Sequence, residues 1–107
     1  MSRLGRPLGV VTLLLLAAKV EADQVWLKNG DRLSGKIQYR ERRYLVLSSP
    51  ALGQSVIKWS AVETFQSDVP LELELRGEGG RTVTTVYQGE PGTILTAGGE
   101  VIKLADI

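Results

Sequence analysis

The stretch Leu27-Lys28-Asn29-Gly30-Asp31-Arg32-Leu33-Ser34-Gly35-Lys36-Ile37 decides the fold of this chain. It predicts two strands joined by a tight turn at Asn29 and Gly30, because both residue types tolerate the positive φ that a type I′ hairpin turn requires. Apolar residues recur with a period of two on either side of the turn, so one face of the hairpin is apolar and the other is wet. Asn29 and Gly30 are therefore the residues that define this hairpin.

The first 22 residues have the layout of a secretory signal peptide. Two arginines form a positive start, residues 8–18 are an apolar run, and small or tolerated residues precede a cleavage site after Ala22. The alternative is an uncleaved anchor in the inner membrane formed by residues 8–18, but charged residues end the run before the roughly 20 apolar residues that a span needs. We therefore expect a periplasmic protein that begins at Asp23 and has no membrane span after cleavage.

The composition argues against catalysis. Removing 22 of the 107 residues leaves 85, enough for one small domain or two minimal units that share a core. The chain has no cysteine and no histidine, so disulfides, thiol nucleophiles and the commonest general base and metal ligand are all missing. The paired carboxylates Glu72 and Glu74 alternate with leucines, which favours a solvated strand face over an acid–base pair. We expect no enzymatic activity, no metal and no other cofactor.

Strand and turn signals divide residues 23–68 into five short strands. After the hairpin, strands are expected at 43–48, 55–59 and 63–66, with a single 3₁₀ turn at 60–62. Five short strands with a one-turn helix before the last are typical of an SH3-like small barrel, also called Sm-like. We therefore predict an all-β fold in which residues 23–68 form an SH3-like β-barrel unit.

Residues 69–107 form a second, shorter copy of the same β unit. The segment 56–62, Val-Ile-Lys-Trp-Ser-Ala-Val, matches the segment 101–107, Val-Ile-Lys-Leu-Ala-Asp-Ile, and an alternating strand at 71–75 and a strand at 81–87 precede the second of these. The first unit continues into a closing strand, for which the second unit has no counterpart up to Ile107. The first unit or a partner chain supplies that strand, or the edge stays open; a second copy as partner gives a homodimer.

A cluster of basic and aromatic residues is the candidate contact for an anion or another partner. It consists of Arg40, Arg42, Arg43, Tyr39 and Tyr44. Basic residues interleaved with aromatics can hold phosphates and stack on bases or sugars. The alternative, favoured by the need of any hairpin tip for polar residues, is a turn kept soluble by its charges and a barrel end covered by the tyrosines.

Two family resemblances rest on these segments. Leu-Lys-Asn-Gly-Asp-Arg-Leu-Ser-Gly at 27–35, Tyr-Leu-Val-Leu at 44–47 and Ile-Lys-Trp-Ser-Ala-Val at 57–62 resemble the periplasmic region that precedes the membrane barrel of YdiY-like outer-membrane proteins, a salt-induced family of unknown function. The resemblance implies an exported envelope module. The chain lacks the alternating, roughly 10-residue strands of an outer-membrane barrel, so we expect a stand-alone module or a truncated relative.

The hairpin and the bent strand with Gly35 are also similar to the Sm-like fold of Hfq-type RNA chaperones. That family has a tyrosine-lysine-histidine-alanine segment where this chain has Trp59 and Ser60, and the chain has no histidine. This resemblance implies an open SH3-like barrel, and RNA binding would require that residues 1–22 are not an export signal.

Together these patterns predict a non-enzymatic, exported cell-envelope β-domain protein that binds or spaces envelope components. Its partner would be an envelope protein, bound at the open sheet edge, or an acidic glycolipid, bound by the arginines. The alternative is an Sm-like nucleic-acid-binding protein, which export would exclude.

Overall fold

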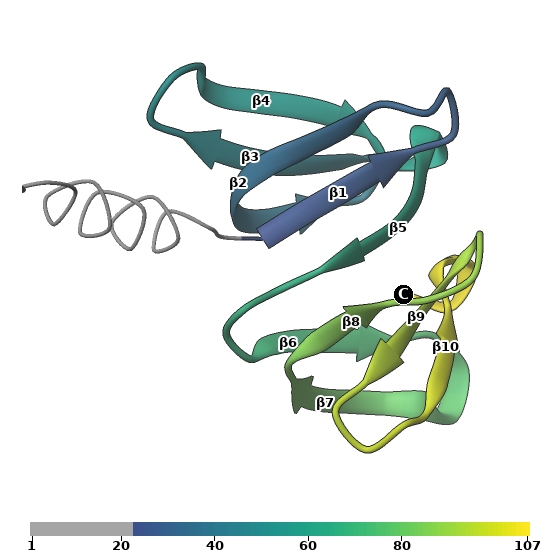
Figure 1. The fold of residues 1–107 in the computed structure, drawn as a ribbon. Helices are drawn as coiled ribbons and strands as arrows, with labels where there is room; N and C mark the ends of the chain where they lie inside the picture. The colour runs from purple at the N-terminus through teal and green to yellow at the C-terminus, as the bar shows by residue number, and fades with distance from the viewer. Residues whose placement is uncertain (1–22) are drawn as a thin grey trace, which may run out of the picture.

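The computed structural model describes residues 23–107, whose arrangement is shown in Figure 1. The predicted signal peptide, its cleavage after Ala22 and the alternative membrane anchor lie outside these residues. No helix in the described part is long and apolar enough to cross a membrane.

The described chain is built of strands and single 3₁₀ turns, so the prediction of an all-β fold is confirmed. The first half contains β1 (Asp23–Leu27), β2 (Arg32–Glu41), β3 (Tyr44–Ser49), β4 (Gly53–Lys58), η1 (Trp59–Ala61) and β5 (Val62–Gln66). The second half contains β6 (Leu71–Leu75), η2 (Gly77–Gly79), β7 (Gly80–Thr84), β8 (Val86–Gln88), β9 (Thr93–Thr96), β10 (Val101–Lys103) and η3 (Leu104–Asp106).

The first half forms one antiparallel sheet with the strand order β4-β3-β2-β1-β5. The order of elements along the chain agrees with the prediction, including the 3₁₀ turn before the last strand. The sheet does not close into a barrel, because β4 and β5 are its two edges and do not pair with each other within the described residues. Instead, β5 passes from this sheet to the second half of the molecule (Figure 1).

The hairpin of β1 and β2 forms as predicted, but its turn is of another type. Of the two residues Asn29 and Gly30, only Gly30 has a positive φ, of 97°. A type I′ turn requires a positive φ at both, so this turn is of another type. The N–H of Gly30 donates to the main-chain oxygen of Leu27 (3.0 Å), and the N–H of Leu27 donates to that of Asp31 (2.8 Å). The loop therefore holds three residues and ends with Gly30 in the left-handed region. The side chain of Asn29 causes the difference, because its Oδ1 accepts the N–H of Asp31 (2.9 Å).

The second half contains two small antiparallel sheets, β6-β7 and β10-β9-β8. The strand expected at 81–87 is interrupted at Thr85, where the chain leaves one sheet and enters the other. Thr84 fixes this step: its Oγ1 donates to the main-chain oxygen of Thr85 (2.8 Å) and accepts the N–H of Ala97 (2.9 Å). A run of β-branched residues thus reads as one strand in the sequence but serves two sheets.

The two halves repeat the same junction between their first strand and their last 3₁₀ turn. After β1, the N–H of Lys28 donates to the main-chain oxygen of Ala61 in η1 (2.9 Å). After β6, the N–H of Arg76 donates to that of Asp106 in η3 (2.7 Å). Ile107 consequently stands where Val62 stands in the first half, at the start of the strand that pairs with β1.

One apolar core joins both halves. Its buried members are Val25, Leu45, Leu47, Ile57, Val62, Phe65, Leu73, Val86, Ile94, Ile102 and Leu104. Hydrogen bonds from β5 also connect the two halves. The buried Thr64 donates from Oγ1 to the main-chain oxygen of Thr93 (2.7 Å) and accepts the N–H of Gly89 (3.0 Å). The second half therefore packs on β5, while the outer edge of β6 has no strand beside it among residues 23–107.

Candidate functional site

A pocket with a volume of about 570 Å³ lies where the β2–β3 turn, η1 and the end of β6 meet. Its cationic lining residues are Arg40, Arg42, Arg43, Lys58 and Arg76. Tyr44 and Trp59 add aromatic surface, and no acidic side chain of the described residues lines the pocket. Since none of these cations forms an ion pair with an acidic side chain within residues 23–107, the pocket combines positive charge with two aromatic rings. We call it the cationic pocket.

Strand pairing brings the cations together. Glu41 pairs with Tyr44 across a loop of only two residues, Arg42 and Arg43, so both arginines project from the hairpin tip. Tyr44 pairs in turn with Lys58 of β4, and the N–H of Trp59 donates to the main-chain oxygen of Arg43 (2.6 Å). The tip and the start of η1 are therefore held side by side.

Arg42 has an unusual backbone conformation. Its φ of 45° is the only positive φ of a non-glycine residue in the described part. A side chain with a Cβ atom in this region costs about 1–2 kcal/mol, and a two-residue hairpin loop usually uses glycine, asparagine or aspartate there. The main-chain oxygen of Arg42 accepts a hydrogen bond from the guanidinium of Arg40, which holds the loop in this shape. A strained arginine at the mouth of a pocket points to a role for its side chain.

Arg40 is committed to the structure rather than to solvent. Its guanidinium carbon lies 4.3 Å from the ring centroid of Trp59, and its Nη1 donates to the main-chain oxygen of Ile107 (2.7 Å). Its buried Nε has no partner among the described residues. Burial lowers the pKa of Arg40 below its usual value, and repulsion from Arg76 adds to this effect. Arg40 thus forms the base of the pocket and ties Ile107 to the first half.

The structure gathers most of the cluster that the sequence analysis singled out. Arg40, Arg42, Arg43 and Tyr44 all line the cationic pocket. Tyr39 is 53% exposed and lines a neighbouring groove instead.

Asn29 and Gly30 form the turn at the β1–β2 end of the sheet and line neither cavity. Sequence reasoning missed Lys58, Trp59 and Arg76 as pocket residues. Lys58 could have been found from the pairing of the strands at 43–48 and 55–59, but no local signal connects Arg76 with the hairpin tip.

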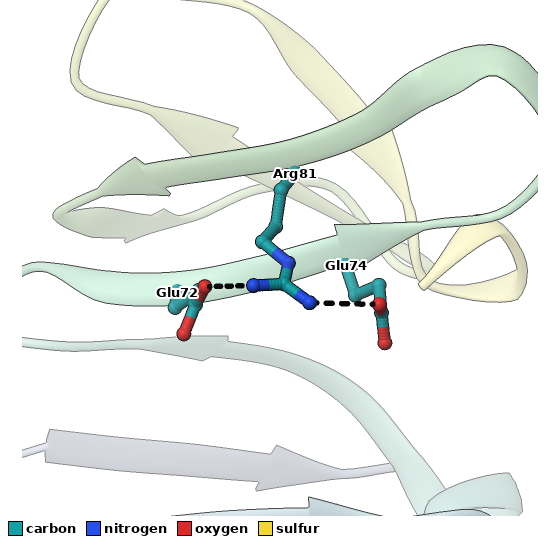
Figure 2. A network of polar contacts seen from close by, with 3 residues as sticks. All are labelled: Glu72, Glu74 and Arg81. Atoms are coloured by element: carbon teal, nitrogen blue, oxygen red, sulfur yellow. Dashed lines mark hydrogen bonds and ion pairs between the residues drawn. The ribbon is translucent and has the colours of Figure 1, made fainter.

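A second charged group lies on the β6–β7 hairpin. Figure 2 shows Arg81 of β7 between Glu72 and Glu74 of β6, with Nη1–Oε2 and Nη2–Oε2 distances of 3.1 and 3.4 Å. All three side chains are more than half exposed, so these ion pairs contribute little to stability. Within residues 23–107, no group of three potential ligands is placed to hold a metal ion.

Comparisons with protein-family models, with curated proteins and with solved structures find no match for this chain.

Proposed function

We propose that this chain is an exported, non-enzymatic binding protein of the bacterial cell envelope, and that its cationic pocket takes an acidic ligand with phosphate groups. The observation that carries the proposal is the set of five cations around Trp59 and Tyr44 without an acidic side chain in the lining. Several guanidinium groups in one pocket favour phosphate, because each can donate two parallel hydrogen bonds to its oxygens.

The division of roles among the arginines supports a binding surface. Arg40 is used for packing and for bonds to main-chain oxygens, whereas Arg42 and Arg43 are exposed at the tip and have no ion-pair partner among the described residues. A ligand can therefore contact Arg42 and Arg43 without breaking a bond that holds the fold. In the envelope, a phosphate-bearing glycolipid offers both the charge for the arginines and sugar rings for the aromatic side chains.

The first experiment measures binding of the chain from Asp23 onward to phosphatidylcholine vesicles with and without lipid A. Each basic residue near an anionic surface contributes about 1 kcal/mol, so Arg42→Ser with Arg43→Ser should weaken binding by about 30-fold. The matched control is Arg32→Ser with Lys36→Ser, which removes the same charge from exposed positions of β2 outside the pocket. This control should bind within about threefold of the wild type, because its charges act only through the screened overall field.

The outcomes separate the candidate ligands. An equal loss of vesicle affinity in both double variants would mean that the net charge of the protein, and not the pocket, binds the vesicles. This result contradicts the proposal. Tight binding of a single-stranded oligonucleotide without binding to the vesicles would support the nucleic-acid alternative. Competition by inorganic phosphate alone would place a free anion, and not a lipid headgroup, in the pocket.

Arg42→Gly tests whether the strained backbone serves binding. Glycine adopts a positive φ without steric cost, so the variant should be as stable as the wild type or more stable by up to about 1 kcal/mol. Its affinity for the lipid A vesicles should nevertheless fall. A variant that loses stability and keeps its affinity would show that Arg42 serves the fold and not the ligand.

Export is tested separately by the mass of the protein recovered from fractionated cells. A periplasmic species that begins at Asp23 agrees with the proposal. A full-length species in the cytosol would overturn the compartment, and a full-length species in the inner membrane would make residues 8–18 an anchor.

A further inference from the structure

The arginines of the cationic pocket come from both halves of the molecule. Arg42 and Arg43 form the hairpin tip of the first half, whereas Arg76 follows β6 in the second half. The backbone of Arg76 is fixed, since its N–H donates to the main-chain oxygen of Asp106 (2.7 Å). Arg40 lies between these two sources of charge, at the base of the pocket. We call Arg42 and Arg43 the tip pair, and Arg40 and Arg76 the inner pair.

The two members of the inner pair are like charges that act on each other. Burial and, second to it, repulsion from Arg76 lower the pKa of Arg40. Hydrogen bonds hold Arg40 in place, because its Nη1 donates to the main-chain oxygen of Ile107 (2.7 Å) and its Nη2 donates to that of Arg42. The fold thus keeps two guanidinium groups near each other, an arrangement that an anion between them would stabilise.

The acidic side chains nearby do not supply this anion. Glu72 and Glu74 share Arg81 as their partner (3.1 and 3.4 Å) and line the neighbouring groove, not the cationic pocket. Asp106 is exposed and lines neither cavity, and its carboxylate forms no ion pair with Arg76 within residues 23–107. The inner pair is therefore open to an acidic group of a ligand.

The amount of charge in the pocket exceeds what one phosphate group offsets. A phosphate monoester carries a charge of about −1.5 to −2 at neutral pH, whereas five cations line the pocket. One phosphate group would leave about three of these charges without a counter-charge, and two would offset about three to four of them. The volume of about 570 Å³ lies within the range of about 300–1,000 Å³ that is typical of pockets for small ligands.

We infer that the ligand of the cationic pocket carries two phosphate groups, one held by the tip pair and one by the inner pair. The inference rests on the proposed function, because it assigns a second contact within the same pocket. Arg76 is then the residue that distinguishes such a ligand from one with a single phosphate group. Its guanidinium can donate two parallel hydrogen bonds to phosphate oxygens, while the fixed charge of Arg40 attracts the same group.

The test compares binding of the chain from Asp23 onward to phosphatidylcholine vesicles that contain diphosphoryl or monophosphoryl lipid A, at equal total lipid A phosphate. Equal phosphate matches the surface charge, so a preference reports that both phosphate groups belong to one molecule. The wild type should bind the diphosphoryl lipid about fivefold more tightly, which is the effect of one basic residue near an anionic surface. Arg76→Ser should reduce this preference to less than about twofold.

The matched control is Lys103→Ser. It removes one exposed cation of the second half that lines neither cavity, so the preference should stay as in the wild type. Arg76 is exposed as well, so the urea unfolding midpoints of both variants should match that of the wild type. If Arg76→Ser is less stable, Arg76→Gln, which keeps most of the aliphatic part of the side chain, gives the same comparison.

Three results would overturn the inference. These are equal affinity of the wild type for both lipids, a preference that survives in Arg76→Ser, and an equal loss of preference in Lys103→Ser. In all three cases the proposed function stands if Arg42→Ser with Arg43→Ser still weakens binding to the monophosphoryl lipid. The absence of binding to either lipid would instead contradict the proposed function and this inference together.

Discussion

At Gly35 the first sheet has no room for an additional methyl group. A Cβ atom added here would lie 2.5 Å from the main-chain oxygen of Ser48 and 3.1 Å from Cγ of Leu47. Gly35 does not have a positive φ, so alanine can adopt its backbone conformation and the effect is purely steric. Because the obstructing oxygen belongs to the backbone of β3, it cannot rotate away and the strands must separate.

The expected cost follows from these contacts. Overpacking of a well-packed site costs about 1–3 kcal/mol, and the clash of Gly35→Ala with main chain places it in the upper half of that range. Restriction of the unfolded chain returns about 0.4–1 kcal/mol, so we expect a net loss of about 2 kcal/mol. For a domain of this size, about 4–8 °C of Tm accompany each kcal/mol, which predicts a fall of about 8–16 °C.

Urea unfolding followed by tryptophan fluorescence, together with a thermal melt, measures this loss. The control is Gly98→Ala, because the nearest heavy atom to an added Cβ there is Oγ1 of Thr96 at 3.8 Å and the backbone has no positive φ. Gly98→Ala should stay within about 0.5 kcal/mol of the wild type or gain stability. If Gly35→Ala were as stable as Gly98→Ala, β2 and β3 could not approach each other at Gly35 as described.

Three further predictions concern the core and the charged groups. Arg40→Met removes the contact with Trp59 and both hydrogen bonds to main-chain oxygens, so the free energy of unfolding measured in urea should fall by about 1–3 kcal/mol. Burial is the main reason that the pKa of Asp23 lies above its usual value, and Asp68 adds to it, so Asp68→Asn should lower that pKa in an NMR titration. Because the folded pKa is the higher one, the stability contributed by Asp23 is full below about pH 4 and is lost as the pH rises through the folded pKa; this loss should be smaller in Asp68→Asn. Ile94 is fully buried in the shared core, so Ile94→Ala should lower the free energy of unfolding by about 2–5 kcal/mol. Both halves should still unfold in a single transition, so fluorescence and circular dichroism should report the same, lower urea midpoint.

The sequence predicts the local elements well where a single physical signal dominates. The period of two around the first turn places the hairpin of β1 and β2 correctly, and the turn predicted at 60–62 lies within one residue of η1, because each depends on neighbours in the chain. The prediction of a type I′ turn was wrong, because a hydrogen bond from the N–H of Asp31 to the side chain of Asn29 outweighs the tolerance of Asn29 for a positive φ. The break at Thr85 was missed because it depends on Ala97, a contact across the second half.

The residues of the candidate site likewise divide into those that a local pattern predicts and those that depend on distant contacts. Arg42 and Arg43 were found from the sequence because a hairpin tip is a local feature, and the structure adds the strain at Arg42 that local propensity does not reveal. Arg76 joins the pocket only because the second half repeats the junction of the first and brings the end of β6 beside η3. A contact of this kind depends on how the two halves pack, and no pattern within either half encodes it.

The equivalent junctions of the two halves also explain why the cationic pocket and the groove lined by Tyr39 are neighbours. In the first half, β5 covers the outer edge of β1 and then continues into the second half, where it packs against β8 and β9. In the second half, the position equivalent to β5 starts at Ile107, whose main-chain oxygen is held by Arg40. The single side chain of Arg40 therefore lines both the cationic pocket and the groove and ties Ile107 to the first half. A ligand held by Arg42 and Arg43 leaves this bond in place, so its binding should not change the packing of the two halves.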